Sequence, residues 1–126
     1  MLILVIDDEK DILQLITTML TSEGHEVVAA EDGERGLELL QDFEDIGVVI
    51  TDLIMPNKEG IETIMDMHKI RPDLKVLAMS GGGRGGIATY LSTAKNIGAS
   101  ATLAKPFRKQ ELLDALEGLL THQEDR

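Results

Sequence analysis

The fold is decided by residues 2–8, Leu-Ile-Leu-Val-Ile-Asp-Asp, in which five aliphatic residues run directly into two acids. An unbroken apolar run of this length is typical of a strand that is buried on both faces of a parallel sheet. Both acids then fall at the carboxyl end of the strand, where open α/β sheets form their binding sites. The stretch therefore predicts a parallel sheet with a polar site at one edge.

The rest of the chain alternates between short apolar runs and longer amphipathic stretches. Further strands are predicted at residues 26–30, 48–51, 74–79 and 101–104, and helices at residues 10–23, 33–42, 57–70, 87–96 and 108–121. Five strand–helix units in alternation indicate a sheet with helices on both faces, joined by right-handed crossovers. No gap is long enough for a linker, so we expect one domain over residues 1–121 and a polar tail over residues 122–126.

The composition limits the kind of protein that this chain can be. With two phenylalanines, one tyrosine and no tryptophan among 126 residues, the core is expected to be aliphatic. The absence of cysteine excludes disulfides and fits a reducing compartment. A formal net charge of −11 argues against direct binding of nucleic acid. The apolar start at residues 1–6 is too short for a signal sequence or a membrane span, so we expect a cytoplasmic location and no membrane contact.

Polar side chains follow four of the predicted strands at their carboxyl ends. Asp7 and Asp8 follow the first strand, Asp52 the third, Ser80 the fourth and Lys105 the fifth. Three carboxylates in one place repel one another at neutral pH unless a cation offsets their charge. Oxygen ligands with no histidine or cysteine nearby suit a hard divalent ion such as Mg²⁺.

Together these groups form a set that can transfer a phosphoryl group. Asp52 would attack, Ser80 would donate a hydrogen bond, and the metal and Lys105 would neutralise charge on the transferring group. Each residue alone is more often structural; Asp8, for example, suits the cap of the helix that follows it. The coincidence at four strand ends favours the functional reading.

The same residues resemble the receiver domains of two-component response regulators. The resemblance extends over residues 2–120 and rests on residues 6–9 (Ile-Asp-Asp-Glu), 51–56 (Thr-Asp-Leu-Ile-Met-Pro), 79–81 (Met-Ser-Gly) and 104–107 (Ala-Lys-Pro-Phe). It implies a flavodoxin-like doubly wound fold, with five parallel strands in the order 2-1-3-4-5 and five helices.

The resemblance also implies a role for each site residue. Asp52 would be the phospho-acceptor. Mg²⁺ would be held by Asp7, Asp8, the Asp52 side chain and the backbone carbonyl of Ile54. The donor would be a sensor histidine kinase or a histidine phosphotransfer protein, and an unidentified downstream protein would read the phosphorylated state. Such a domain is a signalling switch that catalyses only its own phosphorylation and dephosphorylation.

Two further residues complete the implied site. Ser80 would hydrogen-bond the phosphoryl group and Lys105 would form an ion pair with it. The peptide between Lys105 and Pro106 is expected to be cis, an isomer that proline makes accessible.

Two features depart from the family pattern. Thr102 stands where receivers usually carry an aromatic residue that rotates on phosphorylation, so that half of the usual switch is missing. The loop at residues 81–86, Gly-Gly-Gly-Arg-Gly-Gly, is either a tolerant surface loop or a segment that Ser80 orders once phosphate arrives.

Two other functions are weighed against the receiver reading. Residues 81–86 satisfy Gly-x-Gly-x-x-Gly, but Lys105 and Pro106 stand where a dinucleotide site needs an acid. A phosphatase that forms an aspartyl-phosphate uses similar groups, but its strand is expected to end in Asp-x-Asp, whereas residues 7–9 read Asp-Asp-Glu.

Histidines and methionines receive structural interpretations. His25, His68 and His122 show no ligand spacing and are expected at the surface. Met55, Met65, Met67 and Met79 are expected to fill the core or its margin.

Overall fold

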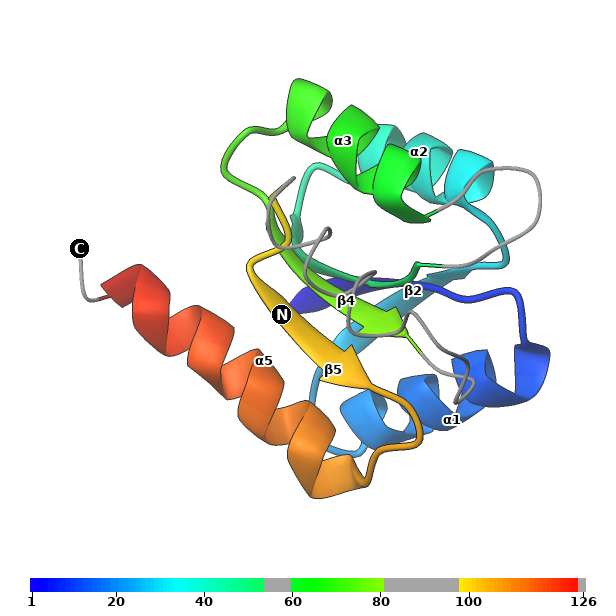
Figure 1. Ribbon diagram of the computed structural model, residues 1–126, viewed down its shortest axis with the longest axis vertical. Helices are drawn as coiled ribbons and strands as arrows, with labels where there is room; N and C mark the ends of the chain where they lie inside the picture. The colour runs from blue at the N-terminus through cyan, green and yellow to red at the C-terminus, as the bar shows by residue number, and fades with distance from the viewer. Residues whose placement is uncertain (54–59, 81–97, 125–126) are drawn as a thin grey trace.

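Figure 1 shows a computed structural model of the chain, in which a single parallel sheet lies between two layers of helices. The structure describes residues 1–53, 60–80 and 98–124, with side chains described up to residue 120. The expected glycine loop at residues 81–86 and the expected helix at residues 87–96 lie outside the described residues.

Strands and helices alternate along the described chain. Their bounds are β1 (Leu2–Ile6), α1 (Lys10–Thr21), β2 (Glu26–Ala30), α2 (Gly33–Asp42), β3 (Ile46–Asp52), α3 (Gly60–Ile70), β4 (Lys75–Ser80), β5 (Ala101–Ala104) and α5 (Lys109–Glu124). The sheet has the order β2-β1-β3-β4-β5, and every pair of neighbours is parallel. Helices α2 and α3 cover one face, and α1 and α5 cover the other (Figure 1). The doubly wound fold is confirmed, with four helices in the described residues.

The central strand β1 shows why residues 2–8 decide this architecture. Ile3, Leu4, Val5 and Ile6 are completely buried. Leu4 and Ile6 pack in the cluster beneath α2 and α3, while Ile3 and Val5 pack in the cluster beneath α1 and α5. Each of these side chains contributes about 1.5–3 kcal/mol by leaving water. The buried hydrophobic residues of the described chain are all aliphatic or methionine, so the expected aliphatic core is confirmed.

Helix α1 ends two residues before the predicted Glu23. Gly24 has a φ of 89°, a left-handed conformation that glycine adopts readily. In this conformation the Gly24 amide donates to the Thr21 carbonyl and the His25 amide donates to the Leu20 carbonyl. This pair of bonds closes the last turn of a helix and redirects the chain into β2.

The interpretation of the methionines was right for two of the four residues. Met67 and Met79 are completely buried, whereas Met65 on α3 is 47% exposed, so its core placement was wrong. The reason is the helical period: Met65 falls between the inward positions Ile64 and Met67 and faces outward. Met55 lies outside the described residues.

Arg71, directly after α3, ties three separate backbone segments together. Its guanidinium donates to the carbonyls of Leu40 at 2.6 Å, Phe43 at 2.8 Å and Ile46 at 2.9 Å. These carbonyls belong to the end of α2, the residue after it and the start of β3. Arg71 therefore holds the end of α2 and the start of β3 together through charge-assisted hydrogen bonds to their main-chain carbonyls.

Replacing Arg71 is expected to destabilise the fold without touching the polar edge of the sheet. Arg71→Ala should lower the free energy of unfolding by about 2–3 kcal/mol, because hydrogen bonds from a charged donor are lost. Arg71→Lys should lose part of this, since one ammonium cannot span three carbonyls. Urea unfolding measures the effect, and Arg108→Ala, whose side chain is 91% exposed, is the control. Equal stability of the Arg71→Ala and Arg108→Ala variants would contradict the assignment.

Candidate functional site

The register of the sheet brings the predicted polar residues to one edge. Ile6 lies opposite Thr51, Asp52 opposite Met79, and Ser80 opposite Ala104. The residues at and just beyond the strand ends therefore come together, although they are far apart in the sequence. Ligand oxygens of Asp7, Asp8 and Asp52 all lie within 4.8 Å of one another.

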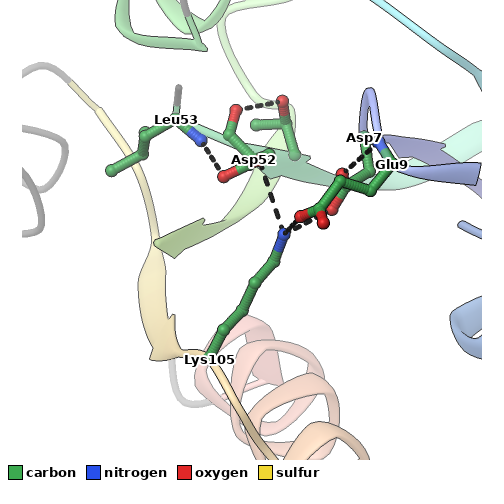
Figure 2. A network of polar contacts seen from close by, with 6 residues as sticks. Asp7, Glu9, Asp52, Leu53 and Lys105 are labelled. Carbon is green, nitrogen blue, oxygen red and sulfur yellow. Dashed lines mark hydrogen bonds and ion pairs between the residues drawn. The ribbon is translucent and has the colours of Figure 1, made fainter. Parts of the chain in front are cut away.

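Lys105 connects the two buried carboxylates of this cluster (Figure 2). Its Nζ lies 2.6 Å from Oδ2 of Asp7 and 3.4 Å from Oδ2 of Asp52. It also lies 3.8 Å from Oε1 of Glu9, a residue that the sequence analysis did not assign to the site. Asp7 is completely buried and the Lys105 side chain is 12% exposed, so the closest ion pair is screened little by water. In this state Lys105 is held chiefly by Asp7.

The Asp52 carboxylate is oriented by the backbone beside it. The amide of Leu53 donates to Asp52 Oδ1 at 2.9 Å, and the hydroxyl of Thr51 donates to the Asp52 carbonyl at the same distance. Asp52 Oδ2 is the oxygen nearer to Lys105. The two oxygens therefore have different surroundings, with Oδ1 fixed to the chain and Oδ2 turned toward the charged cluster (Figure 2).

Ser80 contributes a buried hydroxyl with an unused hydrogen-bonding capacity. Its side chain is completely buried, and its Oγ has no hydrogen-bond partner among the described residues. A buried polar group without a partner costs about 1–3 kcal/mol. Such a group at the end of β4 is well suited to a ligand that brings its own acceptor atoms.

The last site residue is placed by the junction of β4 and β5. The Lys105 amide donates to the Ser80 carbonyl at 2.7 Å, and this bond places Lys105 directly beyond the paired ends of β4 and β5. The Lys105–Pro106 peptide is cis, as the resemblance implied. The backbone carbonyl of Ile54, the remaining expected metal ligand, lies outside the described residues.

The surroundings of Lys105 keep its ammonium charged. Burial alone would lower the pKa of Lys105, but the hydrogen bond to Asp7 and the charges of Asp52 and Asp7 outweigh that effect and raise the pKa above that of an ordinary lysine. The folded state therefore holds this proton more tightly than the unfolded chain. The stabilisation is complete below the unfolded pKa and is lost as pH rises through the folded one.

The raised pKa of Lys105 can be measured in the metal-free protein. The Lys105 ε-methylene resonance should titrate at a higher pH than that of an ordinary exposed lysine, and Asp7→Asn should lower the midpoint because it removes the nearest charge. An NMR titration from pH 8 to pH 12 measures both. A wild-type midpoint below that of an ordinary exposed lysine would mean that desolvation dominates instead.

The donor set of the cluster fits a small divalent cation. Asp7, Asp8 and Asp52 carry three negative charges against the single positive charge of Lys105, and their oxygens are the type of ligand that Mg²⁺ prefers. Asp8 is exposed while Asp7 and Asp52 are buried, so an ion here would have protein on one side and water on the other. That balance suits Mg²⁺, which gives up its water ligands reluctantly.

Comparisons with known proteins agree with this geometry. A family model described as "Response regulator receiver domain" matches residues 3–117. Among curated relatives, the transcriptional regulatory protein GlrR of Escherichia coli is 32% identical over 94% of this chain and 26% of its own length. CpxR of Escherichia coli is 30% identical over 94% of this chain and 48% of its own length. The chain thus spans about a quarter to a half of these relatives.

Solved structures give the same result. A response regulator receiver domain protein from Clostridium thermocellum superposes with a TM-score of 0.88 and 34% identity, covering 98% of this chain and 96% of that one. The receiver domain of NtrX from Brucella abortus superposes with a TM-score of 0.87 and 31% identity, covering 94% of this chain and 98% of that one.

In the part of the chain that the structure describes, no helix combines the length and apolar character needed to cross a bilayer.

Proposed function

The chain belongs to the response regulator receiver family, and from this we propose that Asp52 accepts a phosphoryl group and thereby switches the binding of a partner. One observation carries the proposal. The nearly buried Asp52 carboxylate shares a cluster with Asp7, Asp8 and the Lys105 ammonium at the carboxyl edge of the sheet. The fully buried Ser80 hydroxyl, at the end of the adjacent strand β4, supplies a donor for the incoming group.

The chemistry is an in-line displacement at phosphorus. Asp52 Oδ2 forms the new bond to phosphorus, and the bond from phosphorus to the donor's leaving atom breaks, with its electron pair departing on the leaving group. Lys105 and Ser80 stabilise negative charge on the equatorial oxygens. When bound, Mg²⁺ would be held by Asp7, Asp8 and Asp52, and would neutralise charge on the transferring group. Asp52 Oδ1 stays on the Leu53 amide, which keeps the carboxylate in one orientation.

The product alters the balance of charge at the strand ends. An aspartyl-phosphate carries roughly two negative charges and presents acceptor oxygens that the free carboxylate lacks. The added negative charge attracts the Lys105 ammonium away from Asp7 and toward the phosphoryl group, and the Ser80 hydroxyl can donate a hydrogen bond to one of the new oxygens. Because the Lys105 amide is bonded to the Ser80 carbonyl, both movements act on the junction of β4 and β5.

Thr102 restricts the ways in which phosphorylation can alter the surface of the protein away from the site. It lies on β5 opposite Ala78 and is partly buried. No aromatic ring occupies this position, so the usual rotation of an aromatic side chain does not contribute. We therefore assign the output to the β4–β5 junction and to the surface that continues from it.

Partners follow from the family and from the charge of the chain. The phosphoryl donor is a sensor histidine kinase or a histidine phosphotransfer protein, and the target is a further protein. Several curated relatives are named as transcriptional regulators and are about two to four times as long as the matched region. The full chain of 126 residues carries a net charge of −11, which argues against binding of nucleic acid by the domain at residues 1–121, and we propose a cytoplasmic location for the protein.

The receiver reading differs from the aspartyl-phosphate phosphatase considered above in the role of the phosphoryl-aspartate, which is the signalling state of the protein and not an intermediate in the hydrolysis of outside phosphoesters. The domain acts on its own carboxylate and is a switch rather than an enzyme with turnover. The dinucleotide alternative is disfavoured because Lys105 is engaged with Asp7 at the place where that site needs an acid.

The test is phosphorylation of the purified protein by a small donor. With acetyl phosphate and Mg²⁺ the intact mass should increase by one phosphoryl group, and reductive trapping followed by peptide mapping should place it on Asp52. Calorimetry should also detect uptake of beryllofluoride in the presence of Mg²⁺. Phosphoryl transfer to another residue, or no uptake of either ligand, would refute the proposal.

A further inference from the structure

Gly60, the first residue of α3, lies directly against the backbone of the acceptor residue. A Cβ atom at this position would stand 2.1 Å from the Asp52 carbonyl oxygen and 2.5 Å from the Leu53 Cα. Both are main-chain atoms of a buried strand end, so neither can rotate out of the way. The absence of a side chain at residue 60 is therefore what permits this approach.

The contact continues into the acceptor carboxylate through hydrogen bonds. The Gly60 amide donates to the Leu53 carbonyl at 2.8 Å, and the Leu53 amide donates to both the Met79 carbonyl at 3.0 Å and Asp52 Oδ1 at 2.9 Å. The Leu53 side chain is 1% exposed and packs in the core. Leu53 is thus held by α3 on one side and by β4 on the other, and its amide sets the direction of Asp52.

From this arrangement we infer that Gly60 is a positioning residue for phosphoryl transfer, holding the Leu53 amide where it orients the Asp52 carboxylate. The inference rests on the proposed function. A methyl group at residue 60 needs more than 1 Å of extra room, because an ordinary contact begins near 3.4 Å. That room can come only from movement of the Asp52–Leu53 backbone or of the start of α3. A misplacement of about 1 Å in a reacting group can reduce a rate about 100-fold.

The experiment compares Gly60→Ala with two controls. Gly118→Ala adds the same methyl group to α5, where nothing lies within 4 Å. Leu119→Ala removes a side chain that is 3% exposed in the core beneath α5, and so lowers stability away from the site. Labelling rates are measured at saturating Mg²⁺ and acetyl phosphate, under conditions where each variant is folded.

We expect Gly60→Ala to be labelled about 100-fold more slowly, while both controls stay within threefold of the wild type. In the metal-free protein, the Leu53 amide and Asp52 carboxyl resonances should shift in Gly60→Ala and stay in place in the controls. The Asp52 carboxyl signal reports the surroundings of the acceptor, which a role confined to overall stability would leave unchanged. Normal labelling of Gly60→Ala, or unshifted signals, would overturn the inference.

Hydrogen exchange of the wild type tests the same point if Gly60→Ala does not fold. The Gly60 and Leu53 amides should then show protection within threefold of each other, because the hydrogen bonds of both amides hold the same backbone segment and should open together. Exchange at Gly60 that is 100-fold faster would overturn the inference. If the wild type took no label, the proposed function would fall and the inference with it, whereas normal labelling of both wild type and Gly60→Ala would remove only the inference.

Discussion

Asp52→Asn is expected to reduce phosphoryl labelling to background while the chain remains folded. The amide oxygen of asparagine can still accept from the Leu53 amide, as Asp52 Oδ1 does at 2.9 Å. The nitrogen that replaces Oδ2 has no nucleophilic electron pair, because it is conjugated with the carbonyl, and cannot form the bond to phosphorus. The substitution removes the attraction between Asp52 and Lys105 at 3.4 Å, but it also removes the repulsion of Asp52 by Asp7 and Asp8, so we expect the metal-free chain to remain folded.

A matched Asp→Asn change separates the acceptor from general effects of charge. Asp32 caps α2, where its side chain accepts from the Arg35 amide at 2.8 Å, and asparagine caps helices about as well. Asp32→Asn should therefore be labelled at the wild-type rate. Labelling is followed by intact mass after incubation with acetyl phosphate, and folding by circular dichroism. Persistent label on Asp52→Asn would place the acceptor on another side chain.

Most of the fold was predictable because its signals are local. The unbroken apolar run of β1 can be satisfied only by burial on both faces, and that requirement already implies helices on both sides of the sheet. The start of the third strand was predicted wrongly because of an irregularity in the backbone. β3 begins at Ile46 rather than at the predicted Val48, because the exposed Gly47 is skipped in the pairing with β1 as a bulge.

The meeting of Asp7, Asp8 and Asp52 at one edge of the sheet was also predictable, but the contacts that these side chains make were not. Asp7, Asp8 and Asp52 meet because parallel strands end at the same edge, which follows from topology alone. Which carboxylate holds Lys105 depends on side-chain packing between residues 98 positions apart, and no local pattern encodes it. Lys105 lies closer to Asp7, at 2.6 Å, than to Asp52, at 3.4 Å, and this preference depends on the positions of the side chains in the folded protein.

Gly60 and Arg71 were missed for the same physical reason. In sequence, Gly60 looks like a weak helix residue and Arg71 like a solvated charge before a proline. Their importance lies in backbone atoms that they approach from a distance: Asp52 for Gly60, and Leu40 and Phe43 for Arg71. Contacts to main-chain atoms leave no trace in side-chain patterns, because every residue presents the same carbonyl.

The charge of the cluster leads us to expect that phosphorylation depends strongly on a metal. Asp7, Asp8 and Asp52 with Lys105 leave a formal charge of −2 at the place where a phosphoryl donor with its own negative charges must approach. Two unit charges 4 Å apart repel by about 4 kcal/mol at an effective dielectric constant of 20. Each tenfold change in rate corresponds to about 1.4 kcal/mol, so this repulsion alone can suppress transfer by several orders of magnitude.

Removal of Mg²⁺ is therefore expected to lower the labelling rate of the wild type at least 100-fold, because a divalent ion cancels the −2 charge of the cluster. Chelation with EDTA tests this, and added Mn²⁺ should restore labelling, since it also takes oxygen ligands. Asp8→Asn should shift the Mg²⁺ concentration for half-maximal labelling upward, because Asp8 is the exposed carboxylate of the three and is not the one that holds Lys105. Glu117→Gln, which changes an exposed acid on α5, is the matched control and should leave that concentration unchanged. Labelling in EDTA at more than one-tenth of the normal rate would show that Lys105 alone offsets the charge, and the cluster would then have no need of a metal.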